Sequence, residues 1–172
     1  PQKGADTEMA KQMDEWLKDF AELSREVNPE ADPEYPGSGA AGGLGFALRT
    51  FLNASLESGI SMILNKTGME EHIKSADLVI TGEGKLDGQS VMGKTPTGVA
   101  KLAKKYDKPV IAFSGIVSDD AVLCNDYGID AFFPITREII SMDEAMKPEM
   151  AKKNLADAVE QVYRLITLFE KV

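Results

Sequence analysis

The sequence predicts an α/β fold in which a parallel β-sheet carries helices on both of its faces. Three short apolar runs, at residues 78–81, 110–113 and 131–135, have the length and composition of buried strands. An amphipathic helical pattern follows each run. Strands that alternate with helices are typical of parallel sheets, because each connecting helix packs on a sheet face.

The N-terminal part of the chain is predicted to be mainly helical. Asp6 is a good N-cap, and apolar residues then recur at helical spacing, so we expect an amphipathic helix over Thr7–Val27. Three prolines make residues 28–37 a loop. A second helical pattern covers residues 46–56.

The next segment leads into the predicted sheet. The apolar run Ile60–Leu64 lies between Gly59 and Gly68, and we predict a short strand there rather than a continued helix. Residues 69–74 form a short helical pattern, and the strand at 78–81 follows directly.

Three further helices complete the expected pattern. Residues 97–106 form a helix with lysines near its C-terminus, where the helix dipole favours them. Residues 119–127 form a helix that Gly128 ends. A long helix over residues 149–169 has one apolar face.

Composition and charge exclude several classes of protein. The 172 residues suggest one domain or somewhat more, and a chain of this length needs no disulfide to fold. A net charge of −9 argues against nucleic-acid and membrane-surface binding. Cys124 is a single cysteine, which excludes an internal disulfide and fits the cytoplasm. The sequence contains no run of 18 apolar residues.

Residues 77–106 carry the densest set of candidate functional side chains. Glycine backbone, loop lysines and a helix N-terminus together form an anion-binding cradle. Ligands of open parallel sheets bind just past the C-terminal ends of the strands, where we place this loop. We expect Ser114 and Gly115 to end the next strand and to form a second wall of the same crevice. The candidates in the loop are Gly82, Glu83, Gly84, Lys85, Asp87, Gln89, Ser90 and Lys94.

Two nucleotide-binding patterns occur, and neither has the expected context. Gly88–Thr95 matches G-x-x-x-x-G-K-[ST], but a true phosphate loop requires the strand to abut Gly88, and here residues 82–87 intervene. Gly98 also weakens the start of the helix that should follow. Gly37–Gly42 satisfies G-x-G-x-x-G, but a proline-rich loop precedes it instead of a strand. We therefore interpret the first match as a coincidence within a different phosphate-handling loop and reject the second.

The polar loop also allows a purely structural interpretation. Asp87 and Lys94 could simply pair to pin a surface loop, although exposed ion pairs of this kind are weak. We favour a functional role, because so many polar residue types among four glycines exceed what loop closure requires. Binding and catalytic residues concentrate in such loops.

Four segments, in order along nearly the whole chain, carry a family resemblance. They are PQKGAD at residues 1–6, GSGAAGGLGFAL at 37–48, DLVITGEGKLDGQSVMGKTPTGVAKLAKKY at 77–106 and PVIAFSG at 109–115. The third contains the specific signature TGEG-x-x-D-x-QS-x-x-GK-x-P. Together they resemble the bacterial-type (type I) glycerate kinases. The resemblance implies a cytoplasmic enzyme that phosphorylates D-glycerate with ATP and Mg²⁺, commonly at the 2-hydroxyl.

The resemblance also implies a domain organisation. Members of this family are about twice as long, so the chain resembles their C-terminal half, and the N-terminal half of the same protein is its expected partner. In the family, both chain ends build a Rossmann-like domain, and a second α/β domain is inserted between them. Residues 1–66 would belong to the inserted domain and residues 67–172 to the C-terminal part of the Rossmann-like domain. The sequence leaves the formation of a homo-oligomer open.

Phosphoryl transfer needs positioning, a metal ion and charge neutralisation, and these needs suggest roles for the loop. Asp87 would bind Mg²⁺ or orient the attacking hydroxyl, and Glu83 would be a second metal ligand or a base. Lys94, helped by Lys85, would neutralise phosphate or the glycerate carboxylate. The remaining candidates for nucleotide or substrate binding are Gly82, Gly84, Gln89, Ser90, Ser114 and Gly115. The alternative is a non-catalytic Rossmann-like module that binds an anion without turning it over.

Overall fold

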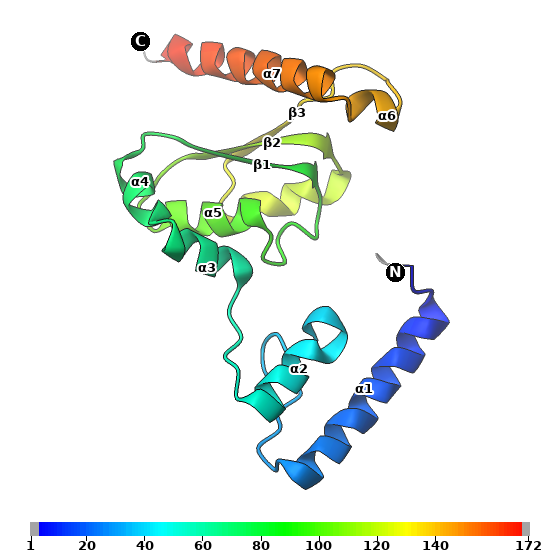
Figure 1. The fold of residues 1–172 in the computed structure, drawn as a ribbon. Coiled ribbons are helices and arrows are strands. Elements are labelled where there is room, and N and C mark those ends of the chain that lie inside the picture. The colour runs from blue at the N-terminus through cyan, green and yellow to red at the C-terminus, as the bar shows by residue number, and fades with distance from the viewer. Residues whose placement is uncertain (1–3, 170–172) are drawn as a thin grey trace. The chain divides into compact units, whose positions relative to one another are not determined.

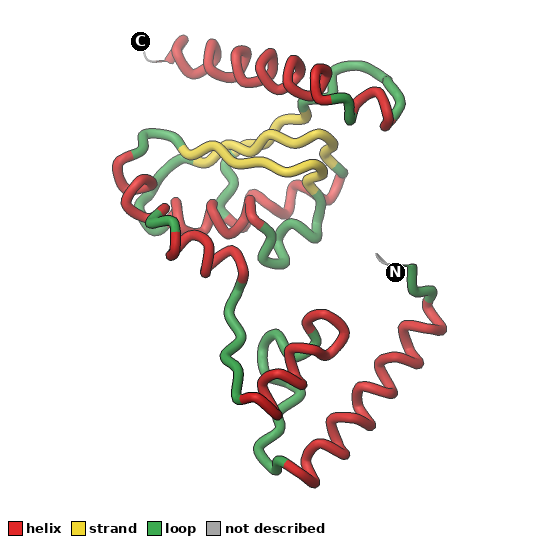
Figure 2. Tube along the Cα trace, viewed as in Figure 1, coloured by secondary structure: helices red, strands yellow, loops and turns green. Residues whose placement is uncertain are grey.

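The computed structural model describes residues 4–169 and divides the chain into two compact units, one up to Glu57 and one from Ser58 onward. Figure 2 shows that the strands belong to the second unit. No helix among the described residues combines the length and the apolar content that crossing a membrane requires. The assignment of residues 1–66 to an inserted domain stays a prediction.

The described residues of the first unit form two helices and the proline-containing loop between them. Helix α1 (Thr7–Val27) has the predicted bounds, and its N-cap is formed as expected, since the Asp6 carboxylate accepts a 2.8 Å hydrogen bond from the Met9 N–H. Helix α2 spans Ala40–Leu52, so it begins before the predicted pattern. The buried core of this unit, within the described residues, consists of Ala21, Ala31 and Phe46.

Helix α2 begins with a left-handed turn, which explains its glycine-rich start. Ala41, Gly42 and Gly43 have φ values of 52°, 69° and 89°, a region that glycine adopts readily and alanine rarely. Regular helix follows, and the Phe46 N–H returns to the Ser38 carbonyl at 2.9 Å. Residues 28–39 before this turn form a loop, and no strand occurs among residues 4–57. The G-x-G-x-x-G match therefore lacks the strand that a dinucleotide site needs.

The second unit has the predicted α/β architecture. Its three strands are parallel, in the order β1-β2-β3. Helix α5 and the 3₁₀ helix η1 lie on one face of the sheet, and α7 covers the other (Figure 1). The elements are β1 (Val79–Leu86), α5 (Thr95–Lys104), β2 (Val110–Val117), η1 (Asp119–Tyr127), β3 (Ala131–Pro134), the short helix α6 (Met142–Ala145) and α7 (Pro148–Phe169).

The main core of this unit lies between the sheet and the α5 face. Ala100 and Ala103 of α5 are fully buried against it, which explains why this helix carries small residues on its inner side. Gly128 ends η1 in the left-handed conformation, as predicted, although η1 is a 3₁₀ helix rather than an α-helix. The buried residues are Ile73, Val79, Leu86, Ala100, Ala103, Val110, Ala112, Ala121, Cys124 and Ile129.

The predicted strand at Ile60–Leu64 is wrong, because this run lies in helix α3 (Gly59–Lys66). Ile60 packs closely against Gly98, so a side chain at position 98 would clash with it. Leu64, one turn after Ile60, is buried. Met62 and Ile63 between them are exposed, so the burial has a helical period that a short, uniformly apolar run does not reveal. Helix α4 (Met69–Ser75) follows as predicted.

Strands β1 and β2 are longer than predicted, and this changes the position of the polar residues. Pairing continues from Gly82 opposite Phe113 to Leu86 opposite Val117. Glycines permit it, because a side chain on Gly82 would clash with the Phe113 carbonyl oxygen, and a Cβ on Gly115 would lie 2.6 Å from the Gly84 carbonyl oxygen. The expectations that Glu83 lies beyond its strand and that Ser114 and Gly115 end theirs are therefore wrong, since all three lie within the strands.

Replacing Gly82 with alanine should destabilise the second unit. The added methyl group would meet a backbone carbonyl that cannot move without breaking strand pairing, so we expect a loss of about 1–3 kcal/mol in the free energy of unfolding. Urea unfolding measures this loss. Gly84→Ala in the same strand is the matched control, because its Cβ would meet no atom within 4 Å. Equal losses in the two variants would contradict the close-approach explanation.

Candidate functional site

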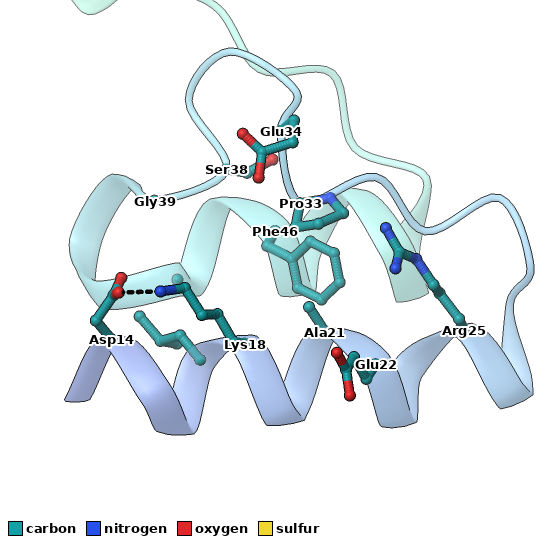
Figure 3. Close-up of a pocket in the computed structure, with 12 residues that line it drawn as sticks. Asp14, Lys18, Ala21, Glu22, Arg25, Pro33, Glu34, Ser38, Gly39 and Phe46 are labelled. Carbon is teal, nitrogen blue, oxygen red and sulfur yellow. Dashed lines mark hydrogen bonds and ion pairs between the residues drawn. The ribbon is translucent and has the colours of Figure 1, made fainter. Parts of the chain in front are cut away.

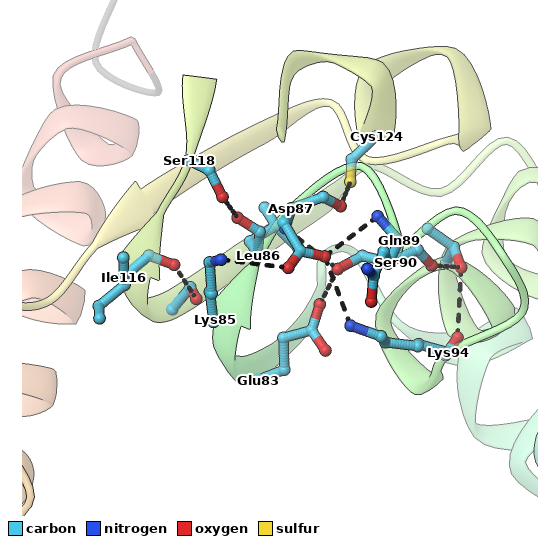
Figure 4. Close-up of polar contacts among 12 residues, drawn as sticks. Glu83, Lys85, Leu86, Asp87, Gln89, Ser90, Lys94, Ile116, Ser118 and Cys124 are labelled. Atoms are coloured by element: carbon cyan, nitrogen blue, oxygen red, sulfur yellow. Dashed lines mark hydrogen bonds and ion pairs between the residues drawn. The ribbon is translucent and has the colours of Figure 1, made fainter. Parts of the chain in front are cut away.

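The predicted polar residues gather where β1 ends and the loop to α5 begins (Figure 4). Glu83 and Lys85 project from β1, and Asp87 follows the strand directly. Gln89 and Ser90 belong to the loop, and Lys94 is the N-cap residue of α5. Residues spread over twelve positions of sequence thus form one cluster.

Asp87 is the electrostatic centre of this cluster. Its carboxylate lies 3.4 Å from the Lys94 ammonium and 3.5 Å from that of Lys85, and it accepts a 3.1 Å hydrogen bond from the Gln89 N–H. Its side chain is 15% exposed, whereas the two lysine side chains are 40% and 57% exposed. Burial alone would raise the pKa of Asp87, but the Gln89 N–H and the two lysines together lower it below its ordinary value.

Ser90 connects the Glu83 carboxylate to the backbone of Asp87 from inside the loop. Its hydroxyl accepts a 3.2 Å hydrogen bond from the Asp87 N–H and donates to the Glu83 carboxylate. Ser90 is completely buried, and its carbonyl accepts a 2.6 Å hydrogen bond from the hydroxyl of Thr97, which is also buried. Because α5 carries Thr97, this helix fixes the loop from below.

The loop resembles a phosphate loop in its spacing and differs from one in its hydrogen bonds. Since β1 reaches Leu86, only Asp87 separates the strand from Gly88, so the predicted six-residue interruption is wrong. The N–H groups of Ser90 and Met92, however, bind the carbonyls of Asp87 and Gln89 at 2.9 and 3.0 Å. Two consecutive turns therefore use N–H groups that a phosphate cradle would direct at its ligand.

Predicted residues on β2 lie beside the cluster. Ser114 pairs with Glu83 across the two strands, is buried, and donates a 2.7 Å hydrogen bond to the Ile116 carbonyl. Gly115 lines a cavity of about 440 Å³ that Gly82 and Glu83 also line. This cavity reaches both strands and lies on the sheet face that α7 covers, and the crevice shared by the Asp87 loop and Ser114 stays a prediction.

Three residues that support the cluster carried no recognisable signal in the sequence. Thr97 holds the loop as described. The Ser118 N–H and hydroxyl bind the Leu86 carbonyl at 3.0 and 3.2 Å, which secures the last residue of β1. The Cys124 thiol lies 3.8 Å from the Asp87 carbonyl, and burial and the nearby carboxylates raise the pKa of that thiol. Their roles depend on tertiary contacts that local patterns do not encode.

The cluster offers two carboxylates to a cation and no complete protein cage. Among the residues that the structure describes, no group of three or more histidine, cysteine, aspartate or glutamate side chains is placed to hold a metal ion. Mg²⁺, however, is usually bound through one or two carboxylates together with substrate phosphates and water. Glu83 and Asp87 supply two carboxylates and fit that smaller requirement.

The first unit contains a separate cavity of about 330 Å³ between α1 and the residues before and within α2 (Figure 3). Phe46 and Ala21 form its floor, and Lys18 at its edge is bound to Asp14 at 2.6 Å. Acidic side chains outnumber basic ones in its lining, so the cavity does not provide a second anion site.

Comparison of the sequence with known proteins identifies relatives of this chain. A sequence profile of the glycerate kinase family matches residues 1–167. Glycerate kinase from Haemophilus influenzae is 41% identical over 166 residues, which cover 96% of this chain and 43% of the relative. Glycerate 2-kinase from Escherichia coli is 46% identical over 147 residues, which cover 86% of this chain and 39% of the relative.

The structural comparison agrees with the sequence comparison. The crystal structure of a protein assigned as glycerate kinase 2 from Salmonella typhimurium LT2 matches with a TM-score of 0.59 at 36% identity. The match covers 95% of this chain and 43% of that one. The chain therefore spans less than half the length of the relatives that it matches.

The ion pairs of Asp87 should make stability depend on pH. Because the folded state lowers the pKa of Asp87, its stabilisation is complete above the unfolded-state value of about 3.9 and is lost as the pH falls through the lower folded value. Asp87→Asn should therefore be less stable than the unchanged protein at pH 5–7, and the difference should shrink below about pH 4. Urea unfolding across this pH range measures it; a difference independent of pH would contradict the assignment.

Proposed function

Because the chain belongs to the glycerate kinase family, we propose that it forms part of an ATP-dependent enzyme that phosphorylates D-glycerate. The observation that carries the proposal is the cluster around Asp87, where two lysines and two carboxylates meet at the C-terminal end of a parallel strand. The name of the Escherichia coli relative, glycerate 2-kinase, supports the 2-hydroxyl as the acceptor.

The two lysines are suited to the charge that phosphoryl transfer develops. The transferred group spreads negative charge over its oxygens, and positioned cations stabilise that charge. The Lys94 and Lys85 ammonium groups lie on either side of one carboxylate, at 3.4 and 3.5 Å, and both remain partly exposed. In the proposed enzyme they shift from Asp87 towards the phosphate oxygens or the glycerate carboxylate as substrate enters.

Asp87 is the residue that we assign to the hydroxyl or the metal. Its lowered pKa keeps it ionised at neutral pH, as both tasks require. Glu83 and Asp87 would hold Mg²⁺, which when bound neutralises phosphate charge and orients the phosphoryl group. Ser90 is buried, and its hydroxyl holds the Glu83 carboxylate next to the Asp87 backbone.

Backbone groups of the glycine segments complete the proposed site. Gly82 and Gly115 line the cavity beside Glu83. Gln89 lies at the exposed side of the loop, next to Lys94. We propose that these residues contact the substrate or the nucleotide, while the buried Ser114 supports the strand.

The short length of the chain bears on where activity resides. Its relatives are more than twice as long, so we propose that catalysis needs the part of the family fold that this chain does not match. A coupled assay with ATP and D-glycerate, run on the chain alone and with a polypeptide equivalent to that part, tests this. Turnover only in the mixture is expected, whereas binding without turnover in both cases would favour a non-catalytic anion-binding module.

Asp87→Asn should abolish most of the activity of the reconstituted enzyme. Removing the carboxylate takes away a metal ligand or hydroxyl-orienting group, so we expect kcat to fall by about 10²-fold or more while the protein stays folded. The coupled assay measures kcat, and circular dichroism checks folding.

Asp126→Asn is the matched control for that experiment. Asp126 is exposed on η1 and has no ion pair within the described part of the chain, so its loss removes one negative charge without touching the cluster. We expect its kcat to remain within about twofold of the unchanged enzyme. Near-normal turnover by Asp87→Asn would remove Asp87 from the catalytic residues.

A further inference from the structure

A second cavity at the same edge of the sheet has no role in the scheme above. Its volume is about 520 Å³, within the range of small-molecule sites. The residues that line it come from the segment that follows β3 and from the first turns of α7. The residues that line it are Arg137, Glu138, Ile140, Met150, Lys153 and Asn154.

Asn154 is the unusual residue in this cavity. The residue is only 9% exposed, yet its side chain has no hydrogen-bond partner among residues 4–169. It is not sealed off, because Thr50 Oγ1 is the one fully enclosed side-chain polar atom of the described residues that lacks a partner. The Asn154 amide therefore opens to the cavity that it lines. A buried amide without a partner is costly, so an amide in this position is suited to a ligand.

The charges of the cavity favour a neutral ligand group over a free anion. Arg137 and Lys153 both bind the Asp157 carboxylate, each at 2.9 Å, and Glu138 adds a further negative charge. The two cations are thus balanced by two carboxylates. Ile140 and Met150 supply apolar surface. A site that combines the apolar surface of two side chains with a free amide is suited to a flat heterocycle that carries a hydrogen-bond donor beside an acceptor.

Neighbouring residues of α7 contribute to this cavity and to the cavity that Glu83 lines. Leu155, next to Asn154, lines the 440 Å³ cavity that Glu83 and Gly115 also line. The Thr136 hydroxyl binds the Gly115 carbonyl at 2.7 Å and joins the end of β3 to β2. β1 and β3 are two strand spacings apart, about 10 Å, which a ribose with its phosphates can span.

We propose that this cavity binds the purine base of the nucleotide, with the Asn154 amide hydrogen-bonded to the adenine edge. The inference rests on the proposed kinase function and names the nucleotide subsite of that function. Asparagine is suited to adenine, because its amide donates to N7 and accepts from N6–H₂. The phosphates would then extend along the C-terminal ends of the strands towards Lys94, as ligands of open α/β sheets do.

Calorimetric titration of the 172-residue chain with ATP and with GTP tests the proposal, because the second unit contributes the whole cavity. The unchanged chain should bind ATP more tightly than GTP. Asn154→Ala should weaken ATP binding about tenfold or more, because the bidentate contact to adenine is lost. GTP binding should stay within about twofold, because guanine does not form this pair of hydrogen bonds with the amide. Asn154→Leu, which keeps the volume, should give the same result if the alanine variant folds poorly.

Gln161→Ala is the matched control, because Gln161 is an exposed amide on the same helix outside this cavity. It should leave both affinities unchanged. Equal ATP binding by the unchanged chain and both Asn154 variants, or no binding of either nucleotide by the unchanged chain, would overturn the proposal.

The result is separable from that of the kinase assay. If the reconstituted enzyme phosphorylates glycerate and Asn154→Ala leaves its KM for ATP unchanged, the base subsite is wrong and the kinase function stands. If ATP binds in an Asn154-dependent way but glycerate is not phosphorylated, the base subsite stands and the kinase function is wrong.

Discussion

Strands β1 and β2 stay paired beyond the point where their side chains become polar, and the proposed site depends on that register. Glu83 lies opposite Ser114, and Lys85 opposite Ile116, because glycines at positions 82 and 115 let the two backbones approach closely. A rigid strand, rather than a mobile loop, therefore presents the first carboxylate. Groups carried by paired strands are held more precisely than groups carried by loops, as the positioning of phosphate oxygens requires.

Local signals predicted much of this fold. The N-cap at Asp6 and the apolar spacing after it fixed both ends of α1, and Gly128 marked the end of η1. The run Ile60–Leu64 was assigned wrongly, because an apolar segment of this length fits a strand or a helix equally well. The packing of Ile60 against Gly98 goes with the helix, and that contact joins residues far apart in the sequence.

The sequence predicted which residues gather at the candidate site better than it predicted the strands and loops that position them. The polar residues of positions 83–94 do converge, yet the sequence placed the end of β1 five residues too early, at residue 81. Glycine is rare inside strands, so Gly82 and Gly84 suggested a loop, whereas both lie in β1 and Gly82 permits the close approach of the Phe113 carbonyl. The support from Thr97 and Ser118 and the free amide of Asn154 depend on tertiary packing, which leaves no local pattern.

The small core of the first unit has a consequence for how the chain unfolds. Ala21, Ala31 and Phe46 bury little apolar surface, whereas ten residues form the main core of the second unit. Short domains with small cores are marginally stable on their own. Amide hydrogens in α1 and α2 should therefore exchange by local opening well before those of β2, and a single melting temperature would not describe the 172 residues.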